Sequence, residues 1–262
     1  MSELTITAIP AFTDNYLWLL ERGNDAVVVD PGDAAPVRRA LQERGLALRG
    51  ILITHWHPDH IGGLAALKSE FAPPVYGPLA ESQRIAGLTR TLREGDVIEV
   101  LDRSFTVWEV PGHTLGHIAY VAPGLLLCGD TLFSAGCGRL FEGSAAQMHQ
   151  SLNRFRQLSD TTLVYCTHEY TLANLAFAAA VEPDNMAVRE KIQSVREQRA
   201  RNLPSLPSRI GEERLINPFL RVQEPAVVRA AERQAGQPLA GAVEVFAALR
   251  RWKDAFRAPA GW

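Results

Sequence analysis

The sequence contains little cysteine, no long apolar run and little net charge. Its three cysteines, Cys128, Cys137 and Cys166, are odd in number and form no CxxC pair, so a disulfide framework is not expected. No segment approaches the roughly 18 unbroken apolar residues of a membrane-spanning helix, so no membrane partner is expected. The N-terminus lacks the basic segment of a signal peptide, and Asp14 and Asn15 interrupt its apolar stretch. We therefore expect a cytoplasmic protein.

The net charge of -2 argues against a general nucleic-acid-binding protein, and no nucleic-acid partner is expected. The charge is unevenly distributed along the chain. Asp and Glu outnumber Lys and Arg up to residue 170, and the reverse holds from Thr171 onward. A basic second part suits a small anionic substrate. Ordinary charge on helix surfaces explains the same distribution, so the count alone does not decide between the two.

Strand-like and helical segments alternate up to about residue 170, and helical segments dominate afterwards. Short apolar and β-branched runs predict strands at 4–9, 16–20, 26–30, 50–54, 97–100, 105–110, 117–121, 125–128 and 162–166. Helices are predicted at 36–44, 60–71, 144–158, 172–181, 184–201, 225–235 and 243–250. We therefore predict a first domain, residues 1–170, with sheets covered by helices, and a helical second domain, residues 171–262.

The densest cluster of metal-binding side chains is an HxHxDH motif formed by His55, His57, Asp59 and His60. It directly follows the apolar run 50–53, which reads as a buried strand, so the motif lies where a strand leaves a sheet. Alternate residues of an extended chain point the same way, so the first two histidines converge on one point. Asp59 and His60 lie where the backbone turns into a helical segment and can face a second point. One short turn can thus supply half of the ligands of two adjacent metal ions.

Further metal-binding side chains follow the ends of other apolar runs, namely His113, Asp130 and His168. Rigid sheets aim side chains at such strand ends, and the loops there leave room for ligands. Two metal ions need about seven ligands, and these three complete the set that the HxHxDH motif begins. Asp30 also ends an apolar run, and we assign it turn chemistry or support of the ligands. The two remaining histidines are interpreted as structural.

The HxHxDH motif, the later histidine in PGHT (111–114), the aspartate in GDT (129–131) and a final histidine resemble the metallo-β-lactamase fold superfamily. Within it, four further segments are similar to the glyoxalase II (hydroxyacylglutathione hydrolase) family: FTDNY (12–16), GCGRLFEG (136–143), HEYT (168–171) and LRRWKD (249–254). The likeness runs essentially end to end. It implies an α+β fold, a four-layer αββα metallo-β-lactamase sandwich followed by a small all-helical C-terminal domain that contributes to the substrate site.

The resemblance also implies a ligand set for two divalent metal ions per chain. His55, His57 and His113 would hold one ion, Asp59, His60 and His168 the other, and Asp130 would bridge the pair. The carboxylates of Asp59 and Asp130 are thereby the predicted catalytic residues. Zinc is expected in both positions, with iron or manganese as alternatives, because imidazole and carboxylate ligands suit all three metals.

The substrate contacts of the family fall on Arg139, Tyr170, Arg250 and Lys253. Arg250 and Lys253 are three residues apart on a predicted helix and share a face, so both can pair with the carboxylates of glutathione. Phe141 stands where the family often has a tyrosine. It can supply packing but not the hydrogen bond of a tyrosine hydroxyl, which leaves its role open.

The implied reaction is hydrolysis of the thioester S-D-lactoylglutathione to D-lactate and glutathione, the second step of methylglyoxal detoxification. A hydroxide bridging two metal ions would attack the carbonyl, since one zinc ion alone can lower the pKa of water to about 7. The leaving thiolate, with a parent pKa of about 8.5, needs no acid to protonate it. The expected partner is this small glutathione thioester, and the expected oligomeric state is a monomer.

Four alternatives remain open at the level of the sequence. A hydrolase of RNA or phosphodiesters would need a basic surface, and a secreted β-lactamase a signal peptide and usually a cysteine at position 130. A mononuclear-iron persulfide dioxygenase of the same fold also handles glutathione conjugates, but generally lacks a helical C-terminal domain. A catalytically silent binding protein would lose stability rather than turnover on chelation.

Overall fold

The computed structural model describes residues 3–258 and divides into two compact units. Unit 1 comprises the residues up to Val110 together with Leu115–Gly129, and unit 2 comprises Pro111–Thr114 together with the residues from Asp130 onward. This division follows contacts within the chain, whereas the boundary near residue 170 follows a change in sequence character and stays a prediction. In the described part of the chain, no helix is both long and apolar enough to cross a membrane.

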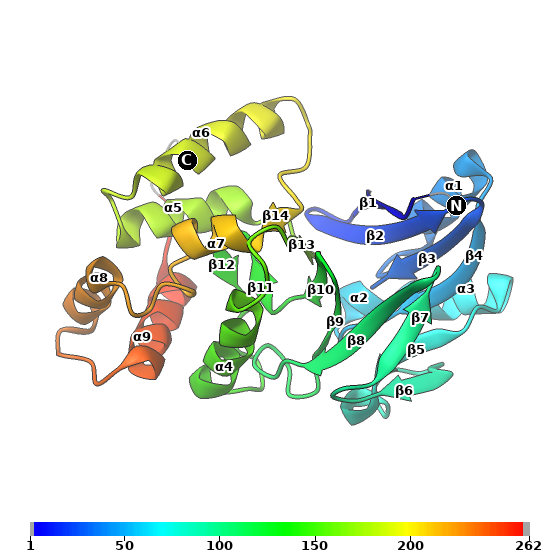
Figure 1. The fold of residues 1–262 in the computed structure, drawn as a ribbon, viewed down its shortest axis with the longest axis horizontal. Coiled ribbons are helices and arrows are strands. Elements are labelled where there is room, and N and C mark those ends of the chain that lie inside the picture. Colours follow the sequence, from blue (N-terminus) through cyan, green and yellow to red (C-terminus); the bar gives the residue numbers. More distant parts are fainter. Residues whose placement is uncertain (1–2, 259–262) are drawn as a thin grey trace. The chain divides into compact units, whose positions relative to one another are not determined.

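Unit 1 contains a six-stranded sheet in which the strands follow their order in the chain (Figure 1). Its strands are β1 (Thr5–Ala11), β2 (Asn15–Arg22), β3 (Asp25–Val29), β4 (Ala47–Leu52), β5 (Val75–Pro78) and β6 (Arg90–Leu92). The first three strands pair antiparallel and the remaining pairs are parallel. The parallel connections contain α1 (Ala34–Arg44), α2 (Pro58–Ile61), α3 (Leu64–Phe71) and the 3-10 helix η1 (Leu79–Glu81).

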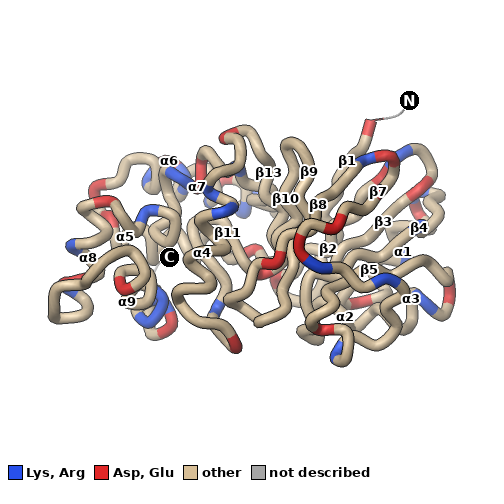
Figure 2. The backbone as a smooth tube through the Cα atoms, turned by 60° about the horizontal axis from the view of Figure 1, so that its bottom comes forward, with Lys and Arg blue, Asp and Glu red and all other residues tan. Residues whose placement is uncertain are grey.

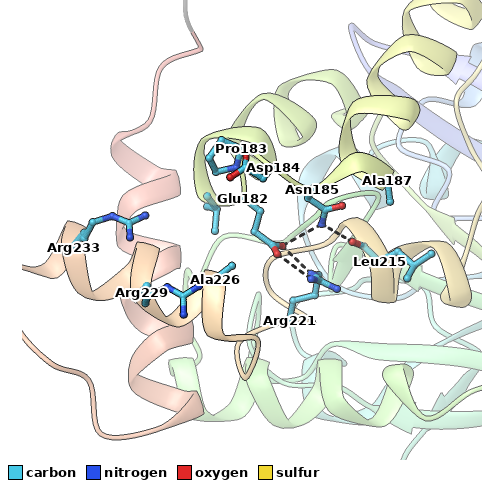
Figure 3. Close-up of a pocket in the computed structure, with 11 residues that line it drawn as sticks. Glu182, Pro183, Asp184, Asn185, Ala187, Leu215, Arg221, Ala226, Arg229 and Arg233 are labelled. Carbon is cyan, nitrogen blue, oxygen red and sulfur yellow. Dashed lines mark hydrogen bonds and ion pairs between the residues drawn. The ribbon is translucent and has the colours of Figure 1, made fainter.

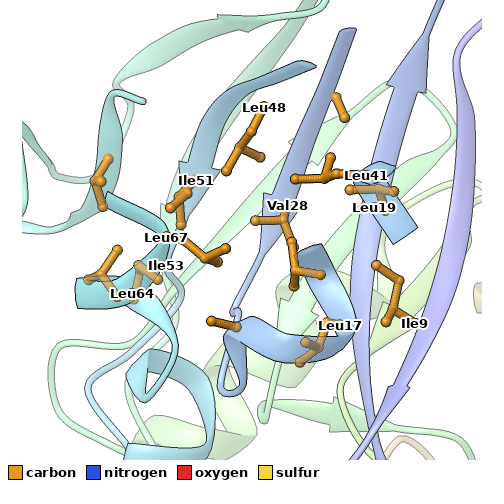
Figure 4. Close-up of a cluster of buried hydrophobic side chains, with 14 of the residues drawn as sticks. Ile9, Leu17, Leu19, Val28, Leu41, Leu48, Ile51, Ile53, Leu64 and Leu67 are labelled. Carbon is orange, nitrogen blue, oxygen red and sulfur yellow. The ribbon is translucent and has the colours of Figure 1, made fainter. Parts of the chain in front are cut away.

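A hydrophobic core packs α1 and α3 against one face of this sheet (Figure 4). Leu17 and Leu19 of β2 point into it and are fully buried. Trp18 and Leu20 alternate with them and are also buried, so both faces of the sheet are covered. A sheet covered on both faces is a rigid platform for the side chains that follow its strands.

The second sheet segment of unit 1 is antiparallel and consists of β7 (Val97–Val100), β8 (Arg103–Glu109), β9 (Ile118–Ala122) and β10 (Leu125–Gly129). It is tied to the end of β4. The N–H of Ile118 donates to the carbonyl of Thr54 over 2.9 Å. The buried Tyr120 hydroxyl donates to the carbonyl of Ile53 over 2.8 Å. These bonds fix the backbone immediately before the HxHxDH motif.

Unit 2 contains two short strand pairs and most of the helices (Figure 1). The strands are β11 (Leu132–Phe133), β12 (Gly136–Cys137), β13 (Leu163–Cys166) and β14 (Ser208–Arg209), and the helices are α4 (Ala145–Arg156), α5 (Thr171–Val181), α6 (Met186–Ala200), α7 (Ile210–Ile216), α8 (Pro225–Ala235) and α9 (Ala242–Ala255). Ser144 and Gln147 form a capping box at the start of α4. A core cluster joins α5, α6 and α7. Figure 2 shows both blue Lys and Arg positions and red Asp and Glu positions on α8 and α9.

Most elements predicted from the sequence are confirmed, and β7 and α8 match at both ends. The single helix predicted at 60–71 is wrong, because the segment forms α2 and α3 with a break at Gly62 and Gly63. The N–H of Gly63 donates to the carbonyl of Pro31 over 2.9 Å instead of continuing the helix. The elements that were not predicted, β5, β6, β11, β12, β14, η1 and α7, are all short.

Glu213 on α7 is fully buried and holds the turn of the β11–β12 hairpin. Its Oε2 accepts hydrogen bonds from the N–H of Ala135 over 2.8 Å and from Asn217 Nδ2 over 3.0 Å. Asn217 also donates to the carbonyls of Phe133 and Gly136. Burial raises the pKa of the Glu213 carboxyl to about 7, although these hydrogen bonds partly oppose the rise. The helix thus fixes the hairpin that follows Asp130.

The variant Glu213→Gln is expected to remove a pH-dependent loss of stability. Between the ordinary pKa of 4.5 and the raised value of about 7, the folded protein binds more protons at this site than the unfolded chain. The free energy of unfolding therefore falls as pH rises through this window, by on the order of 3 kcal/mol. Urea unfolding at pH 5 and pH 7.5 should show a smaller decrease for the variant than for the wild type. Parallel profiles would contradict this assignment.

Candidate metal centre

The HxHxDH motif brings two imidazole nitrogens face to face in unit 1. His55 and His57 follow β4, and Nε2 of His55 lies 3.0 Å from Nδ1 of His57. Two nitrogens bound to one tetrahedral zinc ion at 2.0–2.1 Å lie about 3.4 Å apart, so this spacing suits a shared cation. The ring of His55 is fully buried and stacks on the buried ring of His117 with 4.6 Å between centroids. His117 therefore supports the orientation of His55.

A hydrogen-bond network leaves the facing nitrogen of His55 without a proton. The buried carboxylate of Asp30 accepts from the N–H and from the hydroxyl of Thr54, each over 2.7 Å. Thr54 Oγ1 also lies 3.0 Å from Nδ1 of His55. Because the single hydroxyl proton of Thr54 is donated in the hydrogen bond to Asp30, the hydroxyl oxygen accepts a hydrogen bond from Nδ1–H of His55. The lone pair of Nε2 then points toward His57 and is available for a metal ion.

The same carboxylate acts on His60. Nδ1 of the buried His60 lies 3.1 Å from Asp30 Oδ2 without hydrogen-bond geometry, and the charge of the carboxylate favours a proton on Nδ1, which leaves Nε2 for a metal ion. That Nε2 lies 3.6 Å from Asp59 Oδ2. Asn15, at the start of β2, donates from Nδ2 to Asp59 Oδ2 over 3.0 Å. The Asp59 carboxylate is thus held beside His60 by a residue of a distant strand.

Two loops of unit 1 pack backbone against backbone beneath this cluster. A Cβ atom added to Gly32 would lie 1.8 Å from the carbonyl oxygen of Asp59. Only glycine allows the loop that carries Asp30 to approach the first turn of α2 so closely. This approach places Asp30 beside His60.

Unit 2 contains a second cluster, centred on Asp130. Oδ2 of Asp130 lies 3.5 Å from Nε2 of His113 and 3.2 Å from Nε2 of His168. All three side chains are buried. Nδ1 of His113 lies 2.8 Å from the carbonyl oxygen of Arg139, which can only accept, so Nδ1 holds the proton and Nε2 is the free lone pair. One carboxylate oxygen between two imidazoles suits a bridging ligand.

Close backbone packing also shapes this second cluster. A Cβ atom on Gly138 would lie 1.9 Å from the carbonyl oxygen of Asp130 and 3.2 Å from Nδ1 of His113. The loop that follows β12 therefore passes directly over the backbone of the aspartate. Glycine at this position allows Arg139 to present its carbonyl to His113.

Two aromatic side chains predicted to contact substrate lie against these histidines. Tyr170 stacks on His168 with 4.6 Å between ring centroids and an interplanar angle of 2°. Phe141 meets His113 edge-on at 5.3 Å and is 61% exposed. The Phe141 ring thus lies at the surface beside the buried His113.

The three cations predicted to bind glutathione are held by other groups of unit 2. Asp254 Oδ1 lies 2.9 Å from Arg250 Nη2 and 3.4 Å from Arg139 Nε. Arg250 is 6% exposed, and its Nη1 donates to the carbonyl of Cys137 over 2.9 Å. Its buried Nε has no hydrogen-bond partner among residues 3–258. Lys253 donates to the carbonyl of Ala173 over 3.2 Å. The arginines are thus ordered before any ligand arrives.

Sequence reasoning gave no role to three residues that the structure places in these clusters. Thr54 and Asn15 orient metal-capable side chains, and Asp254 gathers the two arginines. Asp254 was detectable in principle, since it lies four residues after Arg250 on one helix. The contact between Asn15 and Asp59 spans 44 residues, and no local pattern predicts it. Asp30, assigned a supporting role from the sequence, is the residue that orients His55 and His60.

The variant Asp30→Asn is expected to weaken metal binding about 10- to 100-fold. An amide nitrogen at the position of Oδ2 cannot accept from Thr54 and places no negative charge beside His60, so it favours protons on the metal-binding nitrogens. Zinc affinity can be measured by competition with a chelator. Asp33→Asn is the matched control, because Asp33 caps α1 three residues away and asparagine caps equally well. Equal zinc affinities for both variants would refute the role of Asp30.

The chain contains clusters of histidine and aspartate residues that could hold metal ions. Two protein-family models match the sequence of this chain. The model described as metallo-beta-lactamase superfamily matches residues 12–168, and the model described as hydroxyacylglutathione hydrolase C-terminus matches residues 169–256. The predicted α+β fold, an αββα sandwich followed by a helical C-terminal region, is confirmed.

Curated relatives match over nearly the whole chain. A hydroxyacylglutathione hydrolase of Dechloromonas aromatica is 52% identical and covers 97% of this chain and 100% of its own length. One of Alkalilimnicola ehrlichii is 54% identical over 95% of this chain and 98% of its own. The crystal structure of BLEG-1 B3 metallo-beta-lactamase, 24% identical, covers 82% of this chain and 99% of its own with a TM-score of 0.64, which concerns the fold alone. The chain therefore belongs to the hydroxyacylglutathione hydrolase family of the metallo-β-lactamase superfamily.

Proposed function

We propose that this protein hydrolyses S-D-lactoylglutathione to D-lactate and glutathione. The observation that carries the proposal is the similarity, at about half identity over almost the full length, to relatives named hydroxyacylglutathione hydrolase. A persulfide dioxygenase, the alternative from the sequence, has no such support among these relatives. The two clusters of oriented imidazoles and carboxylates supply the chemistry that a metal-dependent thioester hydrolase requires.

The proposed metal centre combines both clusters. His55, His57 and His113 would hold one divalent cation, Asp59, His60 and His168 would hold the second, and Asp130 would serve as a ligand to both. Zinc is the expected metal in both positions, with iron or manganese as alternatives. The lone pairs assigned to His55, His60 and His113 support this set, because in each ring one nitrogen faces a hydrogen-bond or carboxylate partner and the other faces the cluster.

Two such cations would supply a water of lowered pKa and a Lewis acid for the thioester carbonyl. The protein's own residues determine where both cations would lie. Asp130 lies between His113 and His168, one proposed ligand from each set, and Asp30 orients His55 and His60. The thiolate leaves as an anion, because its parent pKa of about 8.5 makes protonation unnecessary. No serine nucleophile or separate general acid is required.

Glutathione recognition is proposed to rest on Arg139, Tyr170, Arg250 and Lys253, with Phe141 contributing packing. The guanidinium of Arg250 is preordered by Asp254, whose Oδ1 accepts from its Nη2 over 2.9 Å. Preordering lowers the entropic cost of binding. We further propose that the protein acts as a cytoplasmic monomer without nucleic-acid or membrane partners, which size-exclusion chromatography and cell fractionation test.

The decisive experiment measures thioester hydrolysis and metal content on the same sample. Purified protein should hydrolyse S-D-lactoylglutathione and contain about two metal ions per chain. Chelation should abolish turnover, and added zinc should restore it. Zinc-loaded protein that binds two ions per chain yet leaves the thioester intact would refute the proposal. One iron per chain with persulfide oxidation would favour the alternative activity.

The pH dependence of KM tests the role of Lys253. Burial, followed in importance by the positive charge of the neighbouring Arg250, lowers the pKa of this amine to about 8. The ammonium therefore exists below about pH 8 and is lost above it, so KM for the thioester should rise between pH 7 and pH 9. In Lys253→Arg the charge persists, and KM should stay level over this range. Identical KM profiles for the two proteins would exclude Lys253 from carboxylate binding.

A further inference from the structure

A pocket of about 520 Å³ lies in unit 2, beside the C-terminal end of α5, the turn at 182–185, α7 and α8 (Figure 3). Its size falls within the range of small-molecule sites, roughly 300–1,000 Å³. None of its lining residues is a predicted metal ligand or substrate contact. It therefore requires a separate explanation.

The carboxylates of the pocket are already paired. Glu182 is buried, and both of its oxygens bind Arg221, with Nε to Oε2 at 2.8 Å and Nη2 to Oε1 at 2.9 Å. The remaining Nη1 of Arg221 donates to the carbonyl of Arg214 over 3.0 Å. Asp184 lies 3.6 Å from Arg189 Nη2. These acids contribute little uncompensated negative charge to the pocket.

Two arginines of the pocket have no such partner. Arg229 and Arg233 lie on successive turns of α8, and Figure 3 draws no interaction from either. Within residues 3–258 neither forms an ion pair or a side-chain hydrogen bond. Residues four apart share one helix face, so two like charges stand about one helical turn from each other, a mildly destabilising arrangement. The helix dipole favours Arg233 in the last turn, but it offers nothing to Arg229.

The rest of the lining is largely apolar. Val181, Ala187, Leu215 and Ala226 provide surface against which a carbon skeleton can pack. Guanidinium groups bind carboxylates and phosphates through paired charge-assisted hydrogen bonds. We propose that this pocket binds a small organic dianion, whose two carboxylate or phosphate groups engage Arg229 and Arg233 while its skeleton contacts the apolar wall.

Calorimetric titration with two probes, succinate as a dicarboxylate and pyrophosphate as a diphosphate, tests the site and distinguishes the two anion classes. The metal-loaded wild type should bind at least one probe saturably with a Kd below about 1 mM. Arg229→Ala with Arg233→Ala should weaken this binding at least tenfold while thioester hydrolysis without probe stays unchanged. Binding of probe by the metal ions themselves is common to both proteins and cancels in the comparison.

A charge-matched control distinguishes binding at this pocket from nonspecific attraction of anions to a positively charged protein. Arg39→Ala with Arg93→Ala removes two exposed arginines of unit 1 and should leave probe binding as in the wild type. Equal affinity of the wild type and the α8 double variant for both probes would overturn the proposal, as would equal losses in the two double variants. Absence of saturable binding to the wild type by either probe would overturn it as well.

Discussion

The site depends above all on one buried carboxylate that decides which nitrogen of two imidazoles is free. Asp30 takes the only hydroxyl proton of Thr54, which commits Thr54 to accept from His55, and it lies directly beside Nδ1 of His60. Both rings then aim the lone pairs of their Nε2 atoms at the interior of the cluster. A histidine with the proton on its metal-facing nitrogen must lose or shift that proton before it binds, so the position of Asp30 affects metal affinity. The tight approach at Gly32 and the two-sided burial of the sheet hold that carboxylate in place.

In unit 2, metal-capable side chains are also oriented by neighbouring groups, but these groups differ from those of unit 1. A backbone carbonyl takes the place of Asp30 in selecting the tautomer of His113, and α7 fixes the hairpin that follows Asp130 through the buried carboxyl of Glu213, whose pKa burial raises to about 7. Asp254 extends this arrangement to ligand recognition, since it orders Arg139 and Arg250 in advance. In both units, residues that are not proposed to bind metal or substrate determine the orientation of the residues that are.

Much of the metal centre and of the fold could be predicted from the sequence because the HxHxDH motif is a local pattern. The HxHxDH motif lies within six residues after a strand, and long strands and helices with clear periodicity were identified close to their observed bounds. Elements of two or three residues, such as β11 and β14, contain too few side chains to show a period. The break at Gly63 escaped prediction because its cause, a hydrogen bond to Pro31, belongs to another loop. Asn15 and Glu213 act across long stretches of chain, so composition and spacing give no sign of them.

The central claim, that buried hydrogen bonds and the charge of Asp30 preselect the metal-binding nitrogens, is tested most directly by a crystal structure of the zinc-loaded protein. The account predicts zinc within about 2.0–2.1 Å of Nε2 of His55, His60 and His113 and of Nδ1 of His57. Coordination of His55 or His60 through Nδ1, with the ring turned away from Thr54 or Asp30, would contradict it.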